Sequence, residues 1–173
     1  MTVKHLLRRL FPKKDPPDEN ARSVLIIDDD SDLRDNLTDI LESEGYEIYG
    51  AATAAEAIRV ARETKPWVAL IDLKLPDKSG TVVLSELKKA KPDTVCILIT
   101  AHADVDSAVQ ALEKGAFYYL RKPVRPEELV ELVDLAFETI RIQQEKRETE
   151  EALRARNQEL EEIIKRLKTI VGE

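Results

Sequence analysis

The sequence predicts an α/β fold in which helices cover both faces of a five-stranded parallel sheet. The first observation is a set of short apolar runs without alternation, such as 24–27 and 68–71, which are typical of strands buried on both faces. The second is the order of the segments, because each strand is followed by ten or more residues with helical periodicity. Such a chain forms a parallel sheet through right-handed crossovers, and for five strands we expect a doubly wound, flavodoxin-like order.

The first half of the predicted domain contains two strands and two helices. The strand at 24–27 leads into a helix that Ser31 can cap and that Gly45 ends. The segment 47–51 is a weaker strand, which we expect nearer an edge of the sheet. A second helix follows, because Thr53-Ala-Ala-Glu56 is a capping box and apolar residues at helical spacing come after it.

The second half of the domain repeats the alternation. Pro66 precedes the third strand, and Gly115 stops the fourth helix. Pro126 lies in the first turn of the last helix, where its missing N–H is tolerated. The expected elements are a strand at 68–72, a helix at 81–90, a strand at 95–99 that ends in Thr100, a helix at 104–114, a strand at 117–120 and a helix from 126 onward.

Composition restricts the function and the compartment. The net charge of −7 argues against nucleic-acid binding driven by bulk charge. Cys96, the only cysteine, lies in an apolar run and is expected to be a small core residue rather than a reactive thiol. No apolar stretch approaches the roughly 20 residues of a transmembrane helix, and no secretory signal with an apolar centre is present. We therefore expect a cytoplasmic protein that does not bind nucleic acid by itself.

Residues 1–21 are expected to form a separate N-terminal segment. Residues 1–14 contain five Lys or Arg and no acid, with apolar residues at helical spacing, which indicates a short basic amphipathic helix. Such a helix can lie weakly on an anionic membrane surface or in the groove of a partner. A frayed tail is the alternative, because short isolated helices are marginal in water. Pro12 ends the pattern, and 13–20 is interpreted as a linker.

Polar residues stand at the carboxyl ends of the strong predicted strands. Since parallel strands open these ends onto one edge, the side chains can converge there. Three carboxylates share a small site only when a cation neutralises them, and oxygen ligands favour Mg²⁺. One carboxylate can then act as the nucleophile that forms an aspartyl phosphate. Each residue alone is an ordinary strand-end residue, but together they favour a phosphoryl-transfer site: Asp28, Asp29, Asp72, Thr100 and Lys122.

With these residues in place, residues 23–142 resemble the receiver domain of bacterial response regulators. The resemblance implies that Asp72 accepts a phosphoryl group from the phosphohistidine of a histidine kinase or a phosphotransfer protein. The motifs that carry it are Leu-Ile-Ile-Asp-Asp at 25–29, Ile-Asp-Leu-Lys-Leu-Pro-Asp-Lys-Ser-Gly at 71–80, Leu-Ile-Thr-Ala at 98–101 and Leu-Arg-Lys-Pro at 120–123.

The resemblance also implies roles for the side chains around this phosphoacceptor. Asp29 would bind Mg²⁺ directly, Asp28 largely through water, and the main-chain carbonyl of Lys74 would be a further metal ligand beside the phosphoacceptor itself. The hydroxyl of Thr100 and the ammonium of Lys122 would contact the phosphoryl oxygens.

Further expectations concern switching and the lifetime of the phosphate. Tyr119 matches the aromatic switch residue of the family, which moves inward when Thr100 is drawn to the phosphate. The Lys122-Pro123 peptide is expected to be cis. Lys74 and His102 flank the site, and the resemblance implies that such positions tune how easily water attacks the phosphoaspartate. A solvated lysine and an ordinary loop histidine are the alternative interpretation.

The C-terminal segment 143–173 predicts a coiled coil. No Gly or Pro occurs at 127–171, so the last helix can continue without interruption. A polar run at 143–151 interrupts the apolar pattern, and a lone charged helix or a disordered tail is the alternative. The heptad pattern, which suits a parallel homodimer, consists of Leu153, Leu160 and Leu167, each followed four residues later by Asn157, Ile164 or Val171.

Several functions remain open at this stage. The receiver, predicted at 22–142, can be a complete adaptor or the N-terminal part of a larger regulator with a kinase, cyclase or AAA+ output. A scaffold with a little-used phosphosite is a third possibility. A haloacid-dehalogenase-like phosphatase also uses an aspartyl nucleophile, but it would have an acid where this chain has Lys74. We therefore expect a phosphoacceptor protein rather than an enzyme acting on other substrates.

Overall fold

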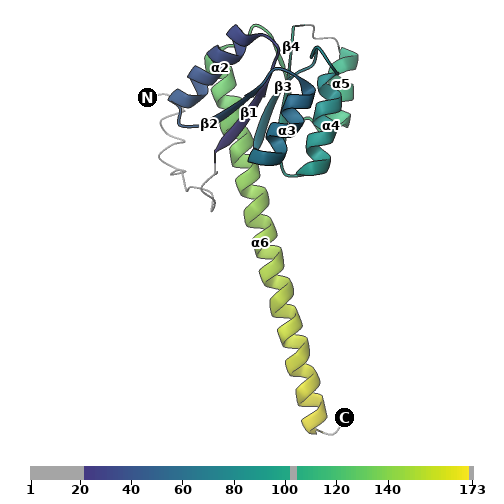
Figure 1. Cartoon of the computed structure of the whole chain (residues 1–173). Coiled ribbons are helices and arrows are strands. Elements are labelled where there is room, and N and C mark those ends of the chain that lie inside the picture. Colours follow the sequence, from purple (N-terminus) through teal and green to yellow (C-terminus); the bar gives the residue numbers. More distant parts are fainter. Residues whose placement is uncertain (1–21, 102–104, 172–173) are drawn as a thin grey trace. The chain divides into compact units, whose positions relative to one another are not determined.

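The computed structural model describes residues 22–101 and 105–171, without the side chains at 105–107 and 171. The predicted basic segment 1–14 with its linker, and His102, therefore lie outside the described residues. Strands and helices alternate along the chain as the sequence predicts (Figure 1). The elements are β1 (Ser23–Ile27), α2 (Ser31–Ser43), β2 (Glu47–Ala51), α3 (Ala54–Thr64), β3 (Val68–Asp72), α4 (Gly80–Ala90), β4 (Val95–Thr100), α5 (Val105–Glu113), β5 (Tyr118–Arg121) and α6 (Pro126–Val171).

The five strands form one parallel sheet in the order β2-β1-β3-β4-β5. This confirms the doubly wound, flavodoxin-like order. β2 lies at an edge, as its weak apolar pattern predicts, and its burial is lower than that of β1, β3 and β4. The winding direction reverses between β1 and β3, so the carboxyl ends of these two strands form the switch point of the sheet.

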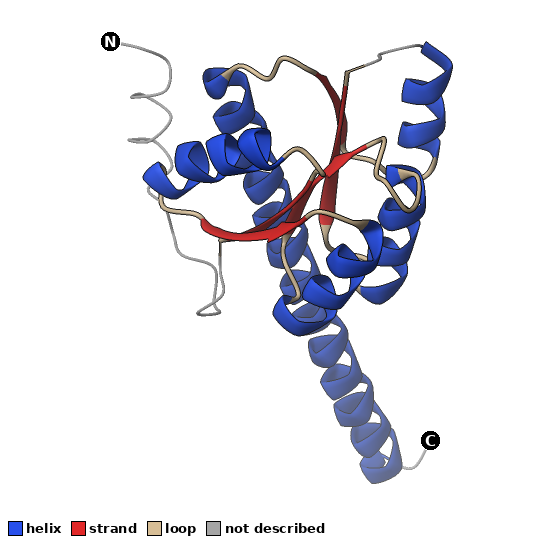
Figure 2. Ribbon diagram, turned by 45° about the horizontal axis from the view of Figure 1, so that its top comes forward, coloured by secondary structure: helices blue, strands red, loops and turns tan. Residues whose placement is uncertain are grey.

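Helices cover both faces of the sheet (Figure 2). On one face, Leu25, Ile71 and Leu98 pack in a core cluster with the buried sides of α3 and α4. Alternation along each strand directs the neighbouring residues to the other face. Cys96 is fully buried in the first cluster, and this burial raises the pKa of its thiol to about 12. Both observations confirm its prediction as a core residue.

The helix caps differ in detail from those predicted. Ser31 is the first residue of α2 rather than its cap, and the carboxylate of Asp30 accepts a hydrogen bond from the Leu33 N–H at 3.1 Å. At α3, Thr53 is the cap as predicted and accepts from the Glu56 N–H at 3.1 Å. The carboxylate of Glu56 bonds the N–H of Ala52, one residue before the cap, so only half of the capping box forms as expected.

Some element boundaries shift by one residue. α4 begins at Gly80, and β5 is Tyr118–Arg121 instead of 117–120. The reason for the second shift is pairing, because Tyr118 is the first residue in register with β4 and Arg121 is paired with Thr100. Gly45 has a φ of 84° and follows the cap of α2, which confirms its predicted place at the end of that helix.

α6 is one helix of 46 residues, Pro126–Val171, as the absence of Gly and Pro predicts. At 1.5 Å per residue its length is about 70 Å. The chain divides into two compact units, Met1–Phe137 and Glu138–Glu173, and α6 contributes to both. Among the residues that the structure describes, none of the helices combines the length and the apolar character that a membrane span requires.

Candidate functional site

The candidate site lies at the carboxyl edge of the sheet, at its switch point. Asp28 follows β1 directly, and Asp72 is the last residue of β3, the strand paired with β1. Thr100 ends β4, and Lys122 follows β5. Four parallel strands thus deliver polar groups to one edge, where open α/β sheets bind ligands.

Three carboxylates meet at this edge. Carboxylate oxygens of Asp28, Asp29 and Asp72 all lie within 4.8 Å of one another. Asp28 and Asp72 are only 2% and 7% exposed, whereas Asp29 is exposed. Three carboxylates so close together repel one another unless a cation lies between them. A set of carboxylate oxygens suits a hard divalent ion such as Mg²⁺.

Lys122 supplies a positive charge to the two buried acids. Its Nζ donates to Oδ2 of Asp28 at 2.7 Å and to Oδ2 of Asp72 at 2.9 Å. Burial by itself lowers the pKa of Lys122, but the hydrogen bonds and charges of Asp28 and Asp72 outweigh it, and the pKa is raised. The ammonium therefore remains protonated at neutral pH and can contact an anion at this edge.

The ion pair with Lys122 does not fully offset the cost of burying the charge of Asp28. Burial raises the pKa of Asp28, and the nearby charge of Asp72 adds to the increase, while the bonds from Lys122 and the Asp30 N–H oppose it. The net increase means that a carboxylate at this position is under-neutralised. A divalent cation beside it would stabilise the charged form against the loss of hydration and against the smaller repulsion from Asp72.

The loop after β3 is folded tightly against Asp72. The Lys74 N–H donates to Oδ1 of Asp72 at 3.2 Å. The backbones of Lys74 and Ser79 are paired in an isolated antiparallel β-bridge. Gly80 then returns so close that a Cβ on it would lie 2.1 Å from the main-chain oxygen of Asp72. Only glycine fits there, and the sequence indicated a loop at Gly80 but not this steric requirement.

Asp77 fixes the same loop to a different helix. Its two carboxylate oxygens accept from the N–H groups of Ala54 and Ala55, at 2.8 and 3.0 Å, in the first turn of α3. The bond from Ala54 leads the interactions that lower the pKa of Asp77. Sequence reasoning missed this contact, because its partners are 23 and 22 residues away and no local pattern joins them.

The remaining predicted residues lie around this centre. Thr100 is 1% exposed, and the Lys122 N–H donates to its carbonyl at 2.8 Å, which joins the ends of β4 and β5. Tyr119 is partly buried against the core cluster and stands in register with Leu98. The Lys122-Pro123 peptide is cis, as expected. The side chain of Lys74 is exposed.

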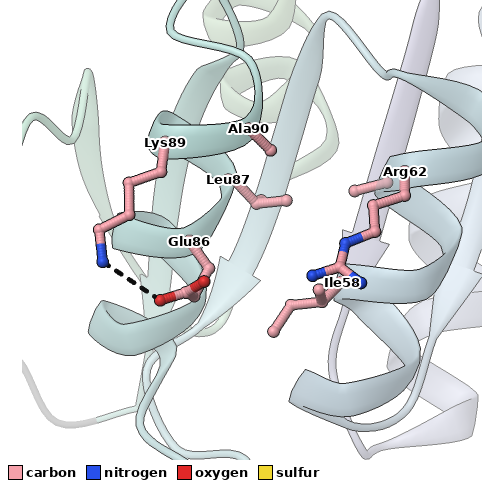
Figure 3. Close-up of a pocket in the computed structure, with 7 residues that line it drawn as sticks. Ile58, Arg62, Glu86, Leu87, Lys89 and Ala90 are labelled. Carbon is pink, nitrogen blue, oxygen red and sulfur yellow. Dashed lines mark hydrogen bonds and ion pairs between the residues drawn. The ribbon is translucent and has the colours of Figure 1, made fainter.

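A separate shallow hollow of about 230 Å³ lies between α3 and α4 (Figure 3). Ile58 and Leu87 contribute its apolar wall, and Glu86 is paired with Lys89 at 3.4 Å. We call the strand ends with Asp28, Asp29, Asp72, Thr100 and Lys122 the acidic edge, and none of these residues lines the hollow. The candidate site is therefore an open strand edge rather than this hollow.

Comparison with known proteins agrees with this geometry. The family model described as "Response regulator receiver domain" matches residues 24–134. The chain is 32% identical over 140 residues to the C4-dicarboxylate transport transcriptional regulatory protein DctD of Rhizobium meliloti, covering 81% of this chain and 30% of that protein. It is 36% identical over 124 residues to the DNA-binding transcriptional regulator NtrC of Escherichia coli, covering 72% and 26% respectively.

Solved structures give the same result. A CheY-like response regulator receiver domain protein from Methanospirillum hungatei matches with a TM-score of 0.69 and 36% identity, covering 70% of this chain and 98% of that one. A crystal structure of NtrX from Brucella abortus matches with a TM-score of 0.68 and 30% identity, over 71% of this chain and 29% of that one. The chain spans less than a third of the length of the curated relatives named above. Because the family model covers residues 24–134, the chain belongs to the response regulator receiver family.

Proposed function

We propose that the chain is a phosphorylation switch in which Asp72 accepts a phosphoryl group in a Mg²⁺-dependent reaction. The donor is the phosphohistidine of a histidine kinase or a phosphotransfer protein in the cytoplasm. One observation carries the proposal: Asp72 ends β3 in contact with Lys122 at 2.9 Å and within 4.8 Å of the oxygens of Asp28 and Asp29. These contacts support the proposed roles of Asp72 as the nucleophile, of Lys122 as the cation and of Asp28 and Asp29 as metal ligands.

In the proposed transfer, a carboxylate oxygen of Asp72 attacks phosphorus, and the phosphorus–nitrogen bond to the donor histidine breaks. The electron pair of that bond remains on the imidazole nitrogen, which takes up a proton. Lys122 balances the negative charge of the transferred group, and the hydroxyl of Thr100 donates to one of its oxygens. Bound Mg²⁺, held by Asp28, Asp29, Asp72 and the Lys74 carbonyl, would neutralise charge on the acids and the phosphoryl oxygens.

The proposed output begins at the two strand ends beside Asp72. Thr100 ends β4, and Tyr119 belongs to β5, which pairs with β4. A phosphoryl group that draws the Thr100 hydroxyl toward it would favour an inward position of Tyr119 and alter the surface of α5 and β5. Lys74 and His102 are proposed to tune hydrolysis of the phosphate. The receiver would catalyse only its own phosphorylation and dephosphorylation.

The C-terminal helix is proposed to pair with a second copy of the chain. Leu153, Leu160 and Leu167 recur every seven residues and are 60%, 45% and 54% exposed. A single chain in water does not bury them, but a coiled coil does. Phosphorylation at Asp72 could then alter either partner binding or this pairing.

A second candidate is the receiver part of a longer regulator. The observation that favours it is coverage, because the matched relatives are transcriptional regulators of which this chain covers 30% or less. In that case α6 would lead into an output module such as an AAA+, kinase or cyclase domain. A scaffold with a little-used phosphosite would instead show no change of oligomeric state or partner binding on phosphorylation.

Intact-mass measurement tests the main proposal. The protein is incubated with Mg²⁺ and acetyl phosphate, and the expected result is a gain of one phosphoryl group that disappears with EDTA and in Asp72→Ala. Asp35→Ala, an exposed acid on α2, is the matched control and should gain the group normally. Absence of the gain in the unmodified protein, or the same gain in Asp72→Ala, would refute the proposal.

A further inference from the structure

Four apolar residues of α6 form a regularly spaced stripe within the unit Glu138–Glu173. Ile142, Leu153, Leu160 and Leu167 are 54%, 60%, 45% and 54% exposed. The steps between them are 11, 7 and 7 residues. We call these four residues the apolar stripe. The first step crosses the polar run 143–151, where the heptad pattern of the sequence is interrupted.

The eleven-residue step keeps Ile142 on the same side of the helix as Leu153. Seven residues make slightly less than two turns and eleven make slightly more than three, so either step changes the direction of a side chain by only about 20°. An eleven-residue step equals one heptad plus four residues, which is a coiled-coil stutter. The stripe therefore continues through the polar run instead of ending at Leu153.

A strict heptad counted back from Leu153 selects different residues. It would place Gln143, Lys146 and Glu150 in the seam, with Glu150 of one helix facing Glu150 of a second copy. Two like charges brought together away from water repel strongly. Lys146 stays in the seam in either register, but the stutter places Thr149 there and moves Glu150 to the flank, where its Oε1 lies 3.9 Å from Nζ of Lys146 in the same helix.

We propose that a second copy of this chain pairs in parallel with α6 along the apolar stripe, and that one stutter carries the seam through the polar run. The parallel direction follows from the flanks, because Arg156 and Glu161 occupy the positions that meet between two parallel helices. Asn157, at a seam position, meets its own copy only in a parallel pair. The inference rests on the homodimer proposed above but not on phosphoryl transfer to Asp72.

Cysteine cross-linking of the full-length protein tests the proposal. Thr149→Cys and Glu150→Cys are neighbouring variants that differ only in which seam includes them, and Ile142→Cys and Gln143→Cys form a second pair. Two thiols facing each other in a parallel seam meet the geometry of a disulfide, whereas thiols on the flank do not. Oxidised glutathione accepts the two electrons, and a non-reducing gel measures the linked dimer.

Two controls accompany these variants. The unmodified protein contains only Cys96, which is fully buried and should give no linked dimer. Leu160→Cys lies in the uninterrupted heptads and should link whenever the helices pair in parallel. We expect Thr149→Cys to form at least about tenfold more linked dimer than Glu150→Cys, and Ile142→Cys similarly more than Gln143→Cys.

Every other outcome overturns the proposal in a recognisable way. Preferential linking of Glu150→Cys and Gln143→Cys would establish the strict heptad. Linking of Leu160→Cys alone would mean that the two helices separate before the polar run. If Leu160→Cys fails to link, the parallel homodimer itself is wrong, while Mg²⁺-dependent phosphorylation of Asp72, measured by mass, would stand or fail separately.

Discussion

At the acidic edge, Asp28 and Asp72 are 2% and 7% exposed and share one ammonium group, whereas the helix beyond Glu138 carries its charges in water. The pair of Arg156 and Glu159, for example, has side chains 65% and 58% exposed. Exposed pairs of this kind contribute little to stability, while buried charges carry a large desolvation cost that their partners must offset.

The two regions also differ in how far apart their partners lie in the sequence. Lys122 meets Asp28 and Asp72 across 94 and 50 residues, so this contact exists only when the whole sheet is folded. The ion pairs of the helix join residues three or four apart and need no tertiary structure. The contacts at the edge therefore form within one chain, whereas we propose that a second copy covers the apolar stripe. The following predictions test this contrast.

The largest effect is expected from Gly80→Ala, because the new Cβ would lie 2.1 Å from the main-chain oxygen of Asp72. Either the loop or the end of β3 must move, and we expect a loss of about 3 kcal/mol in the free energy of unfolding. Urea denaturation measures it. Gly50→Ala is the control, since its Cβ would meet Arg34 at an ordinary 3.5 Å. Equal stability of the two variants would contradict the tight loop.

Asp28→Asn should stabilise the receiver at neutral pH. Burial raises the pKa of Asp28 in the folded protein, so the folded state binds this proton more tightly than the unfolded chain. Stability from this group is then highest below the usual aspartate pKa of about 4 and falls as pH rises through the folded value. We expect a small gain at pH 7 without Mg²⁺, because Lys122 keeps its bond to Asp72 in the variant, and this gain should disappear below pH of about 4.

Urea denaturation over a pH series, with and without Mg²⁺, checks this prediction. The stabilisation that Mg²⁺ gives to the unmodified protein should also be reduced in Asp28→Asn, because a metal-binding oxygen is lost. A variant that is less stable than the unmodified protein at pH 7 would show that Lys122 fully compensates the buried charge.

A smaller effect is expected from Asp77→Ala, which frees the loop after β3 from α3. Mg²⁺ affinity and the rate of phosphorylation by acetyl phosphate should fall by up to about tenfold, because the loop that carries Lys74 loses a restraint. Asp77→Asn keeps one accepting oxygen and should retain part of both. Since the N–H of Ala54 lowers the pKa of Asp77, its carboxylate stays charged below the usual aspartate pKa. Any difference in stability between Asp77→Ala and the unmodified protein should therefore fade only as pH falls through that lowered value.

Isothermal titration calorimetry with Mg²⁺ measures the affinity, and intact mass measured over time gives the rate of phosphorylation. Lys78→Ala, in the same exposed loop, is the control and should leave them unchanged. Identical Mg²⁺ affinities for Asp77→Ala and Lys78→Ala would contradict a positioning role for Asp77.

The smallest effect on the receiver is expected from Leu160→Ser, although it should abolish the dimer. Leu160 is 45% exposed, so its removal should change the free energy of unfolding of the receiver by less than about 0.5 kcal/mol. Sedimentation velocity should show a monomer at concentrations where the unmodified protein is dimeric. A dimer that survives Leu160→Ser would place the pairing surface elsewhere.

The parts of the fold that depend on local pattern were predictable from sequence. The runs at β1, β3 and β4 are apolar because both of their faces are buried, and Thr53 caps α3 because its hydroxyl reaches the Glu56 N–H. Asp30, and not Ser31, is the N-cap residue of α2. Either side chain can accept a hydrogen bond from the first turn of a helix, so only the backbone conformation shows which residue is the cap. Boundaries at β5 followed from pairing with β4, which a single strand does not encode.

The candidate site was predictable as a set of residues but not as a set of contacts. Strand ends in a parallel sheet identified Asp28, Asp72 and Lys122, and the structure brings these three within hydrogen-bonding distance. The contact from Asp77 to α3 and the steric limit at Gly80 were not predictable, because they depend on how the loop returns to the sheet. Recognising Ile142 as part of the apolar stripe depended on its exposure in the structure as well as on its spacing from Leu153.

The central claim is that Asp72 is the single phosphoacceptor, and borohydride trapping tests it most directly. Borohydride reduces an aspartyl phosphate to homoserine, so peptide mapping after phosphorylation with acetyl phosphate and Mg²⁺ identifies the modified position. We expect homoserine at position 72 alone, present in Asp35→Ala and absent when Mg²⁺ is removed. Homoserine at position 28 or 29, or none at any position in a protein that binds Mg²⁺, would contradict the claim.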